Sequence, residues 1–170
     1  MKKYLFLFLF STLWFSGCNE KRPENMPKLY PTRLTFVQED QPLAGAMVLL
    51  KRQIESTQYS CGGMTDTNGV VQIQTHGKYS GAPEGIYTVT VSKTITERLG
   101  PWNEIPTDES AAQTWLKENR NRLKETNYQV VDPKYGNPKT SGLEINVTKK
   151  GSKTTIDLGS PVRVEIKEDH

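Results

Sequence analysis

The sequence predicts an all-β protein, a small β-sandwich of about seven strands with one inserted α-helix. Short runs of apolar and β-branched residues recur along the chain, and several alternate with polar residues, as strands with one buried face do. Residues that form turns separate these runs at short intervals. One stretch after residue 106 instead has the three- to four-residue spacing of an amphipathic helix. Strands of this length and spacing indicate two small packed sheets.

The expected strands follow from the alternation of side chains. The segment "VVQIQT" follows an Asn68-Gly69 pair that suits a tight turn, and "GIYTVTVSK" alternates in the same way. The segment "GLEINVTKKGSKTTIDLG" is expected to be a hairpin that turns through Lys150-Gly151. The strands are expected at 33–37, 46–51, 71–75, 86–91, 143–148 and 154–158, with a last one at 162–166.

An α-helix of about four turns is expected within an insertion at about 100–142. Thr107 is a candidate N-cap, and the carboxylates of the first turn are favourable beside the positive end of the helix dipole. Basic residues gather toward the C-terminal end. We expect the apolar face to pack on the sandwich, and a face that binds a partner is the alternative. The apolar positions are Ala112, Trp115, Leu116 and Leu123.

Residues 1–17 are expected to be a lipoprotein signal peptide. Two lysines precede an apolar stretch that is shorter than the ~20 apolar residues of a membrane-spanning helix. Phe15-Ser16-Gly17-Cys18 resembles a bacterial lipobox, in which a bulky residue and two small ones precede the acylated cysteine. We therefore expect cleavage before Cys18 and lipid on its sulfur. An ordinary signal peptide and a retained membrane anchor are the alternatives.

Residues 18–31 are expected to form the lipidated cysteine and a proline-rich tether, and residues 32–170 the folded domain. Acyl chains on Cys18 would hold the protein in a membrane, because each buried methylene adds roughly 0.8 kcal/mol. The expected location is the cell envelope, lipid-anchored on the periplasmic side. Asn19 after the cysteine, in place of aspartate, mildly favours the outer membrane over the inner membrane.

The charge of the mature chain is close to balanced. Without the two lysines of the signal peptide, 20 basic residues stand against 19 acidic ones. Residues 117–153 nevertheless hold nine Lys and Arg against four Asp and Glu. This excess suits an acidic partner, an anionic envelope surface or an ordinary solvated face. A nucleic acid partner is not expected outside the cytoplasm.

Three short motifs occur in order in the folded part: "LAGA" at 43–46, "TDTNG" at 65–69 and "PEGIY" at 83–87. In this order they resemble the transthyretin-like, carboxypeptidase regulatory-like domains. The later segment "DPKYGNPKTSGLEINV" is similar to the closing strands of lipoproteins of this type that are common in planctomycete-like bacteria. The resemblance covers about residues 32–160 and implies a prealbumin-like β-sandwich. Such motifs describe strands and turns, so they imply a fold rather than an activity.

The sequence offers no set of residues that points to catalysis, and no catalytic residue, cofactor or metal is expected. Cys61 has no second cysteine to pair with once Cys18 is acylated, and Asp66 fits a β-turn better than a calcium loop. His76 follows a strand and His170 ends the chain, so neither belongs to a zinc-binding cluster. Some transthyretin-like proteins are hydroxyisourate hydrolases with a tyrosine-containing C-terminal tetrapeptide, but this chain ends "VEIKEDH".

The expected function is a non-catalytic binding or adaptor module for another envelope protein. Aromatic and basic side chains gather in and beside the insertion, which makes this segment the expected contact surface. A glycan- or small-ligand-binding module that uses the same aromatics is the alternative, and a hydrolase of unspecified type is a less expected third. The candidate surface residues are Trp102, Trp115, Arg120, Arg122, Tyr128 and Tyr135.

Overall fold

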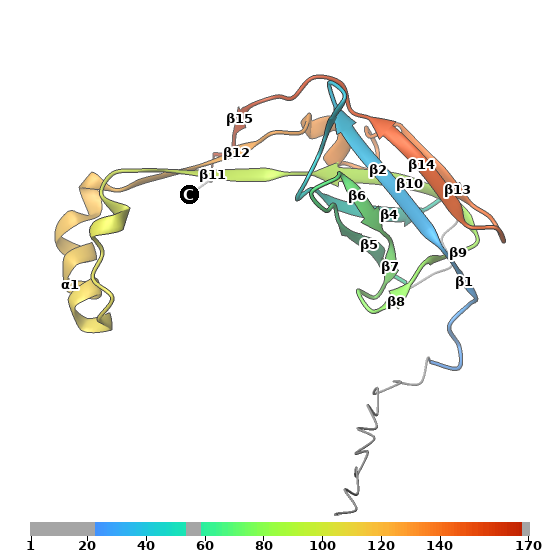
Figure 1. Ribbon diagram of the computed structural model, residues 1–170, viewed down its shortest axis with the longest axis horizontal. Helices are drawn as coiled ribbons and strands as arrows, with labels where there is room; N and C mark the ends of the chain where they lie inside the picture. The colour runs from blue at the N-terminus through green and yellow to red at the C-terminus, as the bar shows by residue number, and fades with distance from the viewer. Residues whose placement is uncertain (1–22, 54–58, 168–170) are drawn as a thin grey trace, which may run out of the picture.

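The computed structural model describes residues 23–53 and 59–167 and shows a β-sandwich from which a long arm projects (Figure 1). The expected all-β sandwich with one inserted α-helix is confirmed. The described residues hold fifteen strands rather than about seven, because many of the pieces have only two or three residues. The expected signal peptide, Cys18 and His170 lie outside the described residues.

The larger sheet of the sandwich has six strands in the order β13-β10-β4-β5-β7-β8. All neighbours in this sheet are antiparallel. β10 is the longest strand of the described chain, and it lies between β13 and β4. The strands span Met47–Arg52 (β4), Cys61–Met64 (β5), Gln74–Thr75 (β7), Tyr79–Ser80 (β8), Gly85–Ser92 (β10) and Leu143–Val147 (β13).

The second sheet is built around β2. This strand pairs in parallel with β14 and antiparallel with β3 and β6, while a separate short ladder joins β1 to β9. The strands span Leu29–Tyr30 (β1), Thr32–Gln38 (β2), Gln41–Pro42 (β3), Val70–Gln72 (β6), Ala82–Pro83 (β9) and Ser152–Asp157 (β14).

The expected hairpin between 143–148 and 154–158 is wrong. β13 pairs with β10, whereas β14 pairs with β2 in the other sheet. A single bridge between Thr148 and Gly151 joins the two segments at the turn. Because the chain passes from one sheet to the other after Thr148, β13 and β14 each form a ladder of five or six residue pairs with a longer strand. Each ladder satisfies backbone donors and acceptors.

Alternating side chains from both sheets fill one core. Leu34 and Phe36 of β2 are fully buried with Val48 of β4 and with Val89 and Val91 of β10. Burial of such side chains supplies the main driving force for folding, roughly 1.5–3 kcal/mol for each. The side chains between them point outward, as the two-residue period of a strand requires. The large apolar side chains exposed on the outer side of the large sheet are Met47, Leu49, Met64 and Ile86.

Hydrogen bonds explain the three sequence motifs at 43–46, 65–69 and 83–87. The Thr65 hydroxyl donates to the carbonyl of Leu43 at 2.6 Å and accepts from the amide of Ala46 at 2.8 Å, so the first two motifs interlock. The carboxylate of Asp66 accepts two backbone amides of its own turn. The Tyr87 hydroxyl donates to the carbonyl of Pro83 at 2.8 Å.

Part of the segment expected to be a tether belongs to the folded domain. Met26 is 9% exposed, and β1 pairs with β9 through Leu29 and Tyr30. The Tyr59 hydroxyl also donates to the carbonyl of Asn25 at 2.8 Å. The domain boundary therefore lies before residue 32, because apolar groups within the proline-rich stretch find partners on the sandwich.

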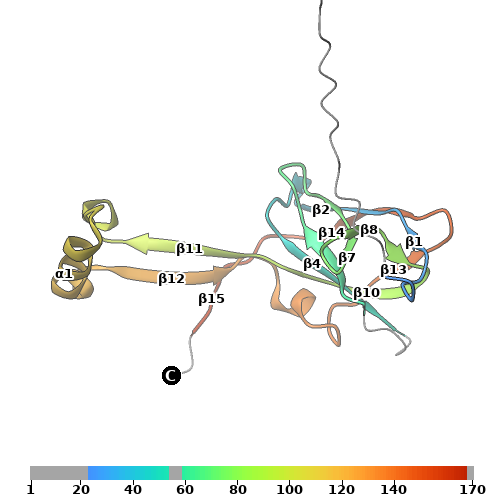
Figure 2. The ribbon, with the colours of Figure 1, turned by 90° about the horizontal axis from the view of Figure 1, so that it is seen from below.

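The arm is a ribbon that continues β10 beyond the sandwich (Figures 1 and 2). It consists of β11 (Thr94–Leu99) paired with β12 (Lys124–Gln129), and β15 (Val164–Glu165) pairs with β12 near the base. At about 3.3 Å per residue, residues 85–99 span about 45 Å. The short helices are η1 (Trp102–Glu104), α1 (Glu109–Asn119) and η2 (Arg120–Arg122) at the far end, and η3 (Pro133–Gly136) beside β10.

The inserted helix α1 lies at the tip of the arm, so the expected packing on the sandwich is wrong. It has eleven residues rather than four turns, and its N-cap is Asp108 rather than Thr107. No residue of α1 is buried, because the apolar face contacts only the end of a thin ribbon. Within the described residues, no helix is long and apolar enough to cross a membrane.

Alkaline pH should destabilise the sandwich through Tyr87. Burial raises the pKa of this phenol to about 12, and the nearby Cys61 adds to the effect. The folded state keeps the phenol protonated while the unfolded chain ionises near pH 10, so stability falls as the pH rises from about 10 to about 12. The loss should reach roughly 2–3 kcal/mol, measured by urea unfolding across this range.

Tyr87→Phe is the matched control for this prediction. The variant should lose about 1 kcal/mol at neutral pH, because the Pro83 carbonyl loses its donor, and should then show a shallower alkaline slope than the original chain. Equal slopes in both proteins would show that Tyr87 does not cause the alkaline loss.

Candidate functional site

The shaft of the arm is held by its backbone ladder and by polar cross-strand pairs. β11 and β12 form six consecutive residue pairs. The Arg98 guanidinium donates to the Glu125 carboxylate at 3.0 Å, and the Thr96 hydroxyl donates to the Asn127 side chain at 2.7 Å. Such pairs contribute about 0.2–1 kcal/mol each. The ribbon therefore keeps a defined direction without an apolar core of its own.

β15 braces the base of this ribbon. Arg163, just before β15, forms an ion pair with Glu97 and lies 4.0 Å from the centre of the Tyr128 ring. The amide of Ile166 also donates to the carbonyl of Asn127 at 2.8 Å. Tyr128 is therefore part of the brace at the base of the arm, and its ring face is already covered by a cation.

At the far end, the chain turns at Gly100 and folds Trp102 back over the ribbon. Gly100 has φ +108°, and a Cβ there would lie 2.1 Å from the carbonyl oxygen of Arg122. The indole nitrogen of Trp102 donates to the carbonyl of Leu99 at 3.1 Å. The Arg98 guanidinium lies 5.1 Å from the centre of the Trp102 ring. Only glycine fits this close approach, which closes the tip.

Helix α1 is fixed at its two ends by local hydrogen bonds. The Asp108 carboxylate accepts from the amide of Ala111 at 2.9 Å, which is the N-cap interaction. At the other end, the Asn119 side chain donates to the carbonyl of Trp115 and accepts from Arg122. The helix is thus built from its own sequence rather than from packing on the sandwich.

A groove of about 430 Å³ lies between α1 and the end of the ribbon. Its apolar surface comes from one tryptophan and two leucines, and charged side chains stand among them. Leu116 is 38% exposed, and the neighbouring Leu99 is 61% exposed. An apolar side chain with a carboxylate nearby would find both kinds of contact here. The groove is lined by Trp102, Leu116, Lys117, Arg120, Leu123 and Glu125.

The six residues predicted as one binding surface do not form one. Trp102 and Arg120 line the groove, and Trp115 and Arg122 lie on the same tip. Tyr128 lies in the braced base of the arm. Tyr135 lies in η3 and packs against the sandwich core, with the Lys134 ammonium 4.8 Å from its ring centre.

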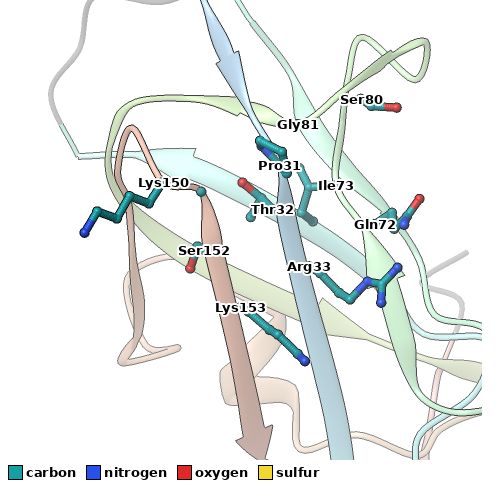
Figure 3. A pocket seen from close by; sticks show the side chains of 11 residues that line it. Pro31, Thr32, Arg33, Gln72, Ile73, Ser80, Gly81, Lys150, Ser152 and Lys153 are labelled. Atoms are coloured by element: carbon teal, nitrogen blue, oxygen red, sulfur yellow. The ribbon is translucent and has the colours of Figure 1, made fainter.

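A second cavity, of about 590 Å³, lies on the sandwich between β2, β6, β8 and β14 (Figure 3). Three basic residues line it, and no carboxylate does. The lining residues are Pro31, Thr32, Arg33, Gln72, Ile73, Ser80, Gly81, Lys150, Gly151, Ser152 and Lys153. We refer to it as the basic cavity.

Sequence reasoning missed the basic cavity. Its three cations, Arg33, Lys150 and Lys153, come from two segments that are more than a hundred residues apart. The parallel pairing of β14 with β2 places Lys153 opposite Arg33. The basic excess in 117–153 indicates part of this site. The expected hairpin, however, does not place these residues beside β2.

Cys61, His76 and Asp66 each have separate structural surroundings. Cys61 is 2% exposed, its sulfur lies 3.4 Å from the Thr75 hydroxyl, and burial raises the pKa of its thiol. His76 is exposed and contacts the Tyr59 ring, while Asp66 binds its own turn. Within residues 23–53 and 59–167, no group of three His, Cys, Asp or Glu side chains is placed to hold a metal ion.

Comparisons with known proteins give one structural match. No family model matches the sequence, and no curated protein matches it. Among solved structures, the chain is similar to the crystal structure of BcpA*(D312A), the major pilin subunit of Bacillus cereus, at 19% sequence identity and a TM-score of 0.40. The match covers 78% of this chain and 30% of the pilin chain.

Replacing Gly100 by alanine should disrupt the tip and leave the sandwich folded. The added Cβ would strike the backbone of Arg122, so the turn and the groove must rearrange. Trp102 and Trp115 are the only tryptophans after residue 17, so tryptophan emission reports on the tip. We expect the tryptophan emission to shift to longer wavelength. The midpoint of urea unfolding of the sandwich, measured by far-UV circular dichroism, should not change.

Gly77→Ala is the control for this prediction. Gly77 has φ +67°, but a methyl group added there would meet no atom within 4 Å, so the variant carries backbone strain without a clash. It should leave the emission unchanged. A cooperative loss of the sandwich in Gly100→Ala would contradict the independence of the tip.

Proposed function

We propose that this protein is a lipid-anchored adaptor of the bacterial cell envelope that binds another envelope protein through the tip of its arm. The observation that carries the proposal is the groove at the tip, where two leucines, one of them exposed, and a tryptophan lie beside cations at the end of a ribbon. Aromatic residues and arginine are enriched at protein interfaces and dominate their binding energy.

The position of the tip supports an adaptor. β10 begins next to β9, which pairs with β1 at the N-terminal side of the sandwich, and the arm continues from the opposite end of β10. A chain anchored through Cys18 would then present its contact surface at the end of the molecule away from the anchored segment. Binding at the tip requires no change in the core.

The sequence motifs support a place for the chain among transthyretin-like, carboxypeptidase regulatory-like lipoproteins. The interlocked Thr65 and Leu43 and the Tyr87–Pro83 hydrogen bond give these motifs clear structural roles in a β-sandwich. Their roles are turns and strand ends, which supports a binding scaffold rather than a catalytic one.

A glycan-binding module is the second candidate, because Trp102 at the groove is the type of platform on which sugar rings stack. Arg98 already covers part of this ring, which favours a protein contact. Soluble glycans should raise the melting temperature of the protein only if the second candidate is correct.

Lipid anchoring is tested by replacing Cys18. The protein isolated from membranes should begin at Cys18 and carry acyl chains, detected by mass spectrometry of the N-terminal peptide. Cys18→Ser should abolish the acylated peptide, because serine lacks the sulfur nucleophile. Cys61→Ser is the matched control and should retain the lipid. An acyl-free Cys18, or a chain that keeps residues 1–17, would contradict the anchor.

The adaptor is tested by crosslinking in cells from a photoreactive residue at position 116, which lies in the groove. We expect links to one envelope protein, and roughly thirtyfold weaker binding of that protein in Trp102→Ala, because a central aromatic contact contributes about 2 kcal/mol or more. Leu49→Asp, an exposed position on the large sheet, is the control and should retain the link. Links scattered over many abundant neighbours would refute the adaptor.

A further inference from the structure

We propose that the basic cavity binds a phosphate-bearing ligand, either the headgroup of an anionic phospholipid or a soluble phosphorylated molecule. The cavity lies on the sandwich and shares no residue with the groove at the tip. It is therefore a second binding site, and its existence does not depend on the adaptor function.

The positive charge of the cavity is not balanced by carboxylates of the described residues. In the part of the chain that the structure describes, Arg33, Lys150 and Lys153 have no carboxylate within 4.0 Å. Some cations elsewhere have such a partner: Arg98 pairs with Glu125, and Lys134 pairs with Asp132. An anion beside Arg33 and Lys153 would reduce the repulsion between these two cations.

The strand register brings two of these cations together. Lys153 of β14 is the direct partner of Arg33 of β2, and Gln72 of β6 is the partner of Arg33 on the other side. Neighbouring strands lie about 4.8 Å apart, and like charges directly opposite each other destabilise a sheet. Figure 3 shows Arg33 and Lys153 projecting from adjacent strands, with Gln72 on the next strand. Together they offer a planar guanidinium, an ammonium and an amide to one oxyanion.

Close backbone contacts fix the walls of the cavity. A Cβ at Gly81 would lie 2.4 Å from the carbonyl oxygen of Tyr30, and one at Gly151 would lie 2.2 Å from that of Pro31. The amide of Ser152 also donates to the carbonyl of Pro31 at 3.0 Å. Both walls are therefore held against the β1–β2 segment, so the site exists before a ligand binds, which lowers the entropic cost of binding.

Two hydroxyl groups and one amide add to the hydrogen-bond donors of the cavity. The side chains of Ser80, Ser152 and Gln72 make no hydrogen bond within the residues that the structure describes. The neighbouring Arg33, Lys153 and Gln72 suit a phosphate, which accepts several hydrogen bonds and carries one or two negative charges. At about 590 Å³ the cavity exceeds a single phosphate, so it has room for the group that carries the phosphate.

The position of the cavity makes a lipid headgroup one source of the phosphate. Pro31 lines the cavity and lies thirteen residues after Cys18, so the chain between them spans at most about 45 Å. If Cys18 carries lipid, as proposed above, headgroups lie within reach. Binding of a lipid headgroup therefore rests on the proposed anchor, whereas binding of a soluble phosphorylated ligand does not.

The test measures the amine-labelling rates of individual lysines by mass spectrometry, using the full chain. One arm adds sodium pyrophosphate to the protein in nonionic detergent, against sodium chloride of equal ionic strength. The other arm places the protein in vesicles of phosphatidylcholine with about 30% phosphatidylglycerol, against phosphatidylcholine alone. Lys150 and Lys153 should be labelled about threefold more slowly with the bound phosphate, while Lys117 and Lys124 on the arm keep their rates.

Arg33→Gln is the diagnostic variant, because the Arg33 side chain is exposed and its removal leaves both reporter lysines in place. Loss of one cation at contact distance should weaken binding roughly fivefold. Lys139→Gln, an exposed lysine outside the cavity, is the matched control and should bind as the original chain does.

The outcomes separate the two sources. Protection by pyrophosphate supports a soluble phosphorylated ligand, and protection only in phosphatidylglycerol vesicles supports a headgroup. No protection in either arm, an equal slowing at Lys117 and Lys124, or unchanged binding in Arg33→Gln would overturn the proposal. Crosslinking from the tip does not depend on this cavity, so failure of the adaptor would leave these results unaffected.

Discussion

The structure depends on the burial of one face of β10. Tyr87, Val89 and Val91 point into the core, and the same strand pairs with β4 and β13. The pairing with β13 ends at Val89 and the pairing with β4 ends at Ser92, and the next residues are half-buried or exposed. A backbone that leaves a sheet must find another partner for its amides and carbonyls. β12 supplies that partner, so the arm exists because β10 continues past the edge of its own core.

Local patterns predicted the elements of this fold better than their partners. The alternation in 85–92 and the helical spacing after residue 106 follow from side-chain periodicity, so both elements were found. The parallel pairing of β14 with β2 joins residues about 120 positions apart, and no local pattern records it. Spacing also indicated the apolar face of α1 without showing what that face contacts, which is the end of a ribbon rather than the core.

The candidate surfaces show the same difference between what local sequence predicts and what depends on strand pairing. Trp102, Trp115 and Arg120 are close in sequence and belong to one compact tip, so proximity along the chain was a good guide there. Tyr135 is also close in sequence but lies beyond the return strand β12, where it packs on the sandwich. The basic cavity required knowledge of strand register, because Arg33 and Lys153 become neighbours only through the β2–β14 ladder.

Different contacts stabilise the base and the outer part of the arm. β15 adds a third strand only at Tyr128 and Gln129, so the outer part of the arm is a two-stranded ribbon, which is marginally stable alone. That outer part is closed by the Gly100 turn and by Trp102 against Leu99. The groove residues therefore stabilise the ribbon as well as forming the proposed contact surface. Since none of them reaches the core, this surface can vary in sequence with little effect on the stability of the sandwich.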